Sequence, residues 1–202
     1  MSDTTLPNDL PPFELRGHRF KPLTWATMTE AQKTMTRQVL GGQRGSMQGP
    51  YNVLLYSPEV GHLAQQFGAH TRFHSSLPLA LNELAILLVA RDWTAQFVWW
   101  IHRRIAQEAG LPTALIDAVA LGQTPKVPLA RDVQAVYDFG RELLAHRRVS
   151  DATHAAMVAS FGDRGVVDLM ATMSYYTLVS MTLNVDGYPL PEGATPELLP
   201  LP

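Results

Sequence analysis

The chain has 202 residues, of which 46% are hydrophobic and 17% are charged, a composition typical of one folded domain with an ordinary core. Its net charge of −2 argues against nucleic-acid binding, which normally requires clustered Lys and Arg side chains. The absence of cysteine excludes disulfides, thiolate metal sites, cysteine nucleophiles and thiol redox chemistry.

The N-terminal segment carries no targeting pattern. Residues 1–12 are polar and contain prolines, without a basic start or an apolar stretch, so we expect no signal peptide. No apolar run reaches the ~18 residues of a membrane span, and residues 169–183, which come closest, are interrupted by Thr, Ser and Tyr. We therefore predict a cytoplasmic protein with no membrane and no nucleic-acid partner.

Helical periodicity dominates the chain and alternating strand patterns are absent, which predicts an all-α, single-domain bundle of about six to eight helices. Residues 1–24 are expected to form an extended arm, residues 25–186 the helical domain, and residues 187–202 a proline-rich tail that is either laid along a surface or disordered. The helices are expected over 27–41, 58–73, 78–91, 94–109, 113–121, 129–148, 151–161 and 164–183. Asp92 or Thr94 is the expected cap of the fourth helix.

The most informative residue is Glu83, because residues 77–90 are otherwise apolar on every side and predict a helix buried almost all round. A buried carboxylate is costly unless a partner or a function keeps it there. His102 lies on the apolar side of the next helix, on one face with Val98 and Ala95. Either residue alone is often a satisfied structural group, but a buried carboxylate and imidazole on adjacent helices together predict a general acid/base pair.

Other patterns are weaker. His70 and His74 have the i, i+4 spacing of helical metal ligands, with His62 nearby, but no third ligand completes a known motif, so we predict no metal. The glycine-rich stretch 41–50 lacks the ending of a phosphate loop and is expected to be a plain connector. Trp99 and Trp100 point in different directions around their helix, one expected at the core and the other at a neighbouring subunit.

The order of several segments resembles the carboxymuconolactone decarboxylase family, which includes the alkylhydroperoxidase D-like proteins. The matching segments are 72–78, 82–87, 96–102, 108–111, 148–153 and 175–184. The resemblance implies an all-helical, alkylhydroperoxidase D-like fold that assembles as a homo-oligomer, a trimer or hexamer, with a pocket at subunit contacts. It implies a small-molecule substrate from aromatic-compound degradation and no cofactor.

In the peroxidase branch of that family, a glutamate lies upstream of a Cys-x-x-Cys-x-x-x-His motif. Glu83 matches that glutamate and His102 that histidine, while the two cysteine positions are occupied by Ala95 and Val98. Thiol peroxidase activity is therefore disfavoured. Cysteine-free relatives resemble Tyr-Glu-Trp at 97–99, so Val98 stands where a second acid is expected.

The decarboxylase branch acts on a lactone that bears a carboxylate, and the substrate itself accepts the electrons released with carbon dioxide. By this resemblance Glu83 and His102 are the catalytic residues, with His102 orienting or stabilising the anion and a protonated Glu83 returning the proton. The predicted substrate-binding residues are Arg72, Arg91, Phe97, Val98, Trp99, Tyr176 and Asn184. Two alternatives remain open: a protein of this fold that binds a small molecule without turnover, and a structural oligomer in which Glu83 and His102 are only a buried pair.

Overall fold

The computed structural model of the chain describes Leu6 and residues 10–200. The first residues of the predicted arm, 1–5 and 7–9, and the last two of the predicted tail, 201–202, lie outside the described residues. The prediction of an all-α protein is confirmed, with 64% helix and no strand in the part of the chain that is described. A 3-10 turn at Trp25–Thr27 precedes the helices α1 (Glu30–Gly41), α2 (Tyr51–Leu54), α3 (Pro58–Phe73), α4 (Leu79–Asp92), α5 (Gln96–Glu108), α6 (Thr113–Ala120), α7 (Arg131–His146) and α8 (Asp151–Asp186).

Helix α4 is the centre of the core. Every residue from Leu81 to Arg91 is buried, and α5, α6, α7 and α8 all pack against this helix. Asn82 fixes its position, because its side-chain amide donates to the Thr71 carbonyl of α3 (3.1 Å) and its carbonyl oxygen accepts from the Thr172 hydroxyl of α8 (2.8 Å). These bonds satisfy a buried amide and hold the neighbouring Glu83 in register with α5 and α8.

Helices α4 and α5 form a hairpin with a very short connection. Thr94 adopts a left-handed conformation (φ 48°), and the Ala95 amide donates to the Ala90 carbonyl (2.8 Å). The expected cap at Asp92 or Thr94 is wrong, because Ala95 occupies the N-cap position and no side chain caps α5. The tight reversal makes the two helices neighbours along their length, which brings Glu83 and His102 together.

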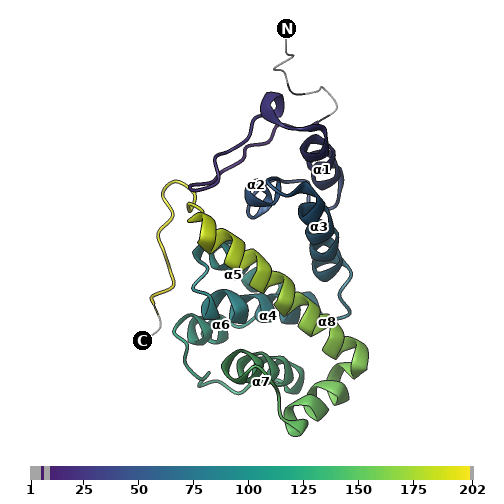
Figure 1. Ribbon diagram of the computed structural model, residues 1–202. Helices are drawn as coiled ribbons and strands as arrows, with labels where there is room; N and C mark the ends of the chain where they lie inside the picture. The colour runs from purple at the N-terminus through teal and green to yellow at the C-terminus, as the bar shows by residue number, and fades with distance from the viewer. Residues whose placement is uncertain (1–5, 7–9, 201–202) are drawn as a thin grey trace.

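Helix α8 runs diagonally past α4, α5 and α7 in Figure 1 and packs on α3, α4 and α7. The predicted break between residues 161 and 164 is confirmed, because Gly162 leaves the helical conformation (φ 66°, ψ 178°) and divides α8 into two helical segments that meet at a kink. By length and composition alone α8 could span a membrane, but half of the relevant window is buried in the fold and a core helix passes the same test. A cytoplasmic location therefore stays a prediction.

The described parts of both terminal segments contact the helical body. Near the N-terminus, the amides of His18 and Phe20 donate to the Asp186 carboxylate at the end of α8 (3.2 and 2.8 Å). The C-terminal segment turns back beside α5 (Figure 1), where Leu198 is buried and the Gln96 side chain bonds its backbone through both amide atoms. Of the two alternatives for the tail, its described part is laid along the surface.

Candidate active site

Glu83 and His102 form a direct hydrogen bond in the core. The His102 Nδ1 atom lies 2.6 Å from the Glu83 Oε2 atom, and the two residues are only 5% and 1% exposed, respectively. An ionised carboxylate can only accept, so with Glu83 ionised the Nδ1 atom carries the proton, and in the neutral imidazole the Nε2 atom then has a free lone pair. The pair therefore has the geometry of an imidazole base oriented by a buried carboxylate.

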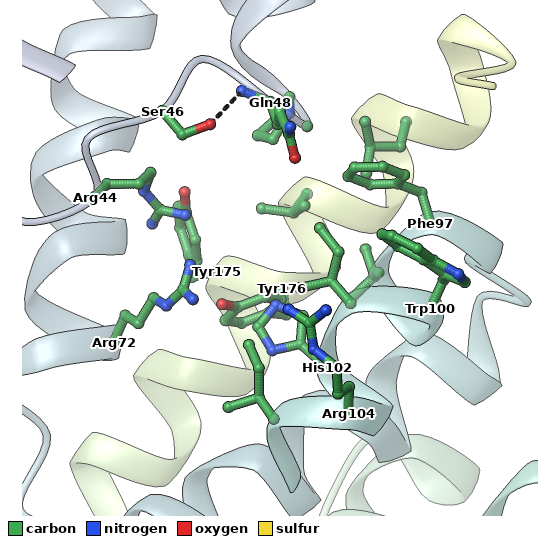
Figure 2. Close-up of a pocket in the computed structure, with 17 residues that line it drawn as sticks. Arg44, Ser46, Gln48, Arg72, Phe97, Trp100, His102, Arg104, Tyr175 and Tyr176 are labelled. Carbon is green, nitrogen blue, oxygen red and sulfur yellow. Dashed lines mark hydrogen bonds between the residues drawn. The ribbon is translucent and has the colours of Figure 1, made fainter. Parts of the chain in front are cut away.

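A cavity of about 310 Å³ opens on the His102 side of this pair. Its walls come from the loop before α2, from α3, from α5 and from α8 (Figure 2). His102 belongs to the wall, whereas Glu83 lies behind the imidazole and outside the lining. We expected Glu83 itself to exchange protons with a substrate, but the arrangement gives that contact to His102.

The cavity is basic. Arg44, Arg72, Arg104 and His102 line it, and none of the described lining residues is acidic. The Arg44 guanidinium lies over the Tyr51 ring (5.5 Å to the centroid) and the Arg72 guanidinium over the Phe73 ring (5.5 Å), contacts that hold a cation without neutralising it. Such a lining favours an anionic ligand.

Two tyrosines of α8 complete the wall beside the imidazole. The Tyr176 ring meets His102 edge to face, with 4.8 Å between ring centroids and 83° between planes, and packs against Tyr175 in the same way at 5.4 Å. Both rings are at most 2% exposed. Burial raises the pKa of the Tyr175 and Tyr176 hydroxyls, so both stay protonated at neutral pH and can donate hydrogen bonds.

Four of the seven predicted binding residues line the cavity: Arg72, Phe97, Val98 and Tyr176. Arg91 does not, which corrects the prediction. It is eight residues beyond Glu83, about 12 Å along the helix, and its guanidinium donates to the Ala120 carbonyl at the end of α6 (3.3 Å).

Trp99 and Asn184 also lie outside the lining. The Trp99 indole N–H donates to the Glu197 carboxylate of the tail (3.1 Å), because a step of one residue from Val98 turns the side chain to another side of α5. The Asn184 amide donates to the Trp93 carbonyl in the α4–α5 connection (2.8 Å). Trp99 lies on α5 and Asn184 on α8, two helices that line the cavity, but neither residue belongs to the lining.

Sequence reasoning missed Arg44 and the position of Trp100. For Tyr175 it left open whether the side chain only packs or lines the pocket with Tyr176, and Tyr175 lines the cavity. The loop that carries Arg44 was expected to be a plain connector, and Trp100 was expected at the core or at another subunit, yet both residues line the cavity. An arginine between glycines is the signal that could have marked the loop. Its approach to α8 depends on packing between distant segments, which no local pattern encodes.

The histidines considered as metal ligands have other surroundings. The His62 Nδ1 atom lies 2.7 Å from the Gln38 side-chain oxygen, and the rings of His70 and His74 are 6.0 Å apart. Over Leu6 and residues 10–200, no three His, Cys, Asp or Glu side chains are grouped as metal ligands.

No family model matches the chain, and no curated protein matches it at a significant level. The likeness to the carboxymuconolactone decarboxylase family thus rests on the residues quoted above.

Proposed function

We propose that the protein is a cofactor-free enzyme that moves protons on a small anionic lactone or another enolisable acid. The observation that carries the proposal is the buried Glu83–His102 hydrogen bond at the wall of a cavity lined with arginines. Titratable pairs of this kind, facing a cavity of ligand size, are typical of acid/base sites.

In the proposed chemistry His102 is the group that touches the substrate and Glu83 is a positioning residue. The free Nε2 atom accepts a proton from a carbon next to a carbonyl group, and the electrons of the C–H bond move into that carbonyl as an enolate. The Glu83 carboxylate stabilises the imidazolium so formed. The imidazolium then returns the proton to the same or another atom of the substrate, which regenerates the base.

Decarboxylation would use the same groups, and the family resemblance favours it. The C–C bond to the carboxylate breaks, carbon dioxide leaves, and the electron pair moves into the lactone carbonyl as an enolate. For this reaction His102 starts as the imidazolium, having taken a proton from solvent at Nε2. It protonates the carbon, is left as the neutral imidazole, and takes up its next proton from solvent. The substrate accepts the electrons itself, so the protein has to orient the carboxylate, stabilise the oxyanion and deliver one proton.

A second candidate is a protein that binds the same ligands without turnover. Val98 supports it, because this residue lies in the cavity wall where the family resemblance leads us to expect a second acid. A reaction that needs two carboxylic groups could not proceed with His102 and Glu83 alone.

Assembly into a trimer or hexamer, which the family resemblance implies, is also proposed, and an exposed apolar face of α3 supports self-association. Val60, Leu63 and Phe67 of α3 are 53%, 67% and 41% exposed and recur at the spacing of one helix face. Light scattering on a sizing column would measure the mass, and a monomer at all concentrations would refute this part.

The function is tested by incubating the protein with a panel of carboxylated butenolides while carbon dioxide and ultraviolet absorbance are followed. In parallel, NMR in D₂O detects exchange of the acidic C–H, which reports proton transfer even without decarboxylation. We expect turnover or exchange that is lost in His102→Asn. Tight binding of panel members, with neither product nor exchange, would establish the binding protein instead.

A further inference from the structure

One end of the cavity holds buried hydrogen-bonding groups that have no partner. The Arg44 Nη2 atom and the Tyr176 hydroxyl are inaccessible to solvent and form no hydrogen bond with any described residue. Both residues line the cavity. Buried polar groups are nearly always satisfied, and leaving one unsatisfied is costly, so two at one place indicate that a ligand supplies the missing acceptors.

The unsatisfied groups are donors, and the neighbouring charge is positive. A guanidinium has only N–H donors, and a phenol that stays protonated offers its O–H. In Figure 2, Arg44 and Arg72 extend from the loop and α3 toward Tyr175 and Tyr176. Neither arginine forms an ion pair with a described carboxylate, so the acceptor expected here is an anion with at least two oxygens.

The other side of the cavity is aromatic. Phe97 and Trp100 project into it from α5, across from the arginines (Figure 2), with ring centroids 6.3 Å apart and planes inclined by 26°. Val98 and Leu183 add apolar surface to the lining. A flat, apolar group fits this wall by stacking and by removal of its surface from water.

We propose that the cavity binds an amphipathic carboxylic acid in one orientation, its carboxylate held by Arg44, Arg72 and the Tyr176 hydroxyl and its flat apolar body against Phe97 and Trp100. His102 lies between these two ends in Figure 2, so the carbon that links carboxylate and apolar body is the one presented to Nε2. The inference rests on the proposed function only in naming this acid as the substrate class.

The head group is assigned by calorimetry with three probes that share a phenyl ring: phenylacetate, the neutral phenylacetamide and phenyl phosphate. We expect phenylacetate to bind at least tenfold more tightly than the amide, because the amide lacks the charge that the arginines complement. Equal binding of acid and amide would overturn the anion site. Tighter binding of phenyl phosphate would overturn the choice of a carboxylate.

Variants then locate the site. R44M and R72M should each weaken phenylacetate binding by about tenfold or more. The control is R131M, which removes the same charge from an exposed residue at the start of α7, outside this cavity, and should leave the affinity within about twofold. If R44M does not fold, R44K tests the same contact, because lysine keeps the charge and loses the planar fork.

Y176F separates binding from structure. It removes only the hydroxyl, which has no partner in the described protein, so the melting temperature without ligand should stay unchanged or rise. Phenylacetate affinity should fall about three- to tenfold. A lower melting temperature with unchanged affinity would show that the hydroxyl is structural and would remove Tyr176 from the proposal.

The failure of this inference can be distinguished from that of the proposed function. If phenylacetate binds as described but no acid of the panel reacts or exchanges protons, the anion site stands and the enzyme assignment fails. If turnover is found and KM is unchanged in R44M and R72M, the enzyme stands and the anion site fails.

Discussion

Replacing Glu83 by Gln tests the proton-transfer chemistry most directly. The two side chains have nearly the same shape, so the amide fits the space that the buried carboxylate occupies. The amide oxygen can still accept from the His102 Nδ1 atom, now 2.6 Å from a carboxylate oxygen, but it carries no charge. If the amide group turns its N–H₂ toward Nδ1 instead, it favours the tautomer whose proton is on Nε2, and the base facing the cavity is lost.

The size of the effect follows from the burial of this pair. A hydrogen bond that involves a charged group is worth about 1.5–3 kcal/mol, and a loss of 1.36 kcal/mol in the transition state slows a reaction about tenfold. The lost stabilisation of the imidazolium therefore accounts for about 10–10² in rate. Loss of the correct tautomer adds to this, so we expect kcat to fall by about 10²–10⁴.

The assay is turnover or C–H exchange on the acid identified by the panel, with ligand affinity measured in the same preparation. Binding should persist, because Glu83 lies behind His102 and outside the cavity lining. A Glu83→Gln variant with full activity would refute the reasoning, since the carboxylate would then have no part in the chemistry.

Glu83→Leu measures the structural worth of the same hydrogen bond. Leucine leaves the buried Nδ1–H of His102 without an acceptor, and we expect the free energy of unfolding to fall by about 1–3 kcal/mol. Replacing both residues at once, as Glu83→Leu with His102→Leu, leaves no unpaired group, so the free energy of unfolding should be recovered in part or fully. Chemical denaturation measures both changes, provided that each variant keeps the assembly state of the parent protein.

Three further predictions concern the surroundings of the site. Gly68→Ala should destabilise the fold by about 1–3 kcal/mol in denaturation, because a Cβ atom there would lie 2.1 Å from Cζ of Tyr175; unchanged stability and ligand affinity would contradict this close packing. Burial alone would raise the pKa of the Asp168 carboxyl, but the hydrogen bonds from Ser76 (amide N to Oδ2, 2.8 Å) and the positive charges of Arg164 and His70 together outweigh it and hold the pKa below its usual value. The carboxylate thus stabilises the fold above pH ~4, an effect lost as the pH falls through the folded pKa, and Asp168→Asn should remove that part of the acid dependence of the denaturation midpoint. Leu198→Ala should weaken docking of the tail by about 1.5–3 kcal/mol, since the leucine is buried; a tail that is cleaved by protease no faster than before would show that Leu198 contributes nothing.

The helices that sequence reasoning placed best are those with strong local signals. The predicted helix 58–73 is confirmed residue for residue by α3 (Pro58–Phe73), which begins at a proline as first-turn positions favour. The helix predicted as buried all round is confirmed by α4, because a run without a polar face can only be covered by neighbours. α2 was missed, since its four residues (Tyr51–Leu54) are too few to show a period.

Within the site, too, the residues with a strong local signal were predicted and those placed by tertiary packing were not. Glu83 and His102 could be found because each is a polar residue at a position where the periodic pattern predicts an apolar one, and a buried polar residue needs a partner or a function. Arg91 is an equally buried charged residue, but its guanidinium bonds the carbonyl end of α6 and does not reach the site. Which polar neighbour a buried group meets depends on tertiary packing, so the sequence can indicate that a group is unusual without indicating what it serves.

The charges of the site explain why the oriented imidazole and the arginines belong to one mechanism. With Glu83 ionised, proton capture by His102 turns a negative pair into a neutral one, while the substrate gains the negative charge of an enolate. That charge develops beside Arg44 and Arg72, which line the same cavity and have no described carboxylate to neutralise them. Because the buried arginine and tyrosine donors are already in place before the reaction, they stabilise the enolate with little reorganisation. A site with the imidazole pair but without the arginines could accept the proton but would not stabilise the enolate. Loss of the arginines should therefore lower kcat as well as affinity.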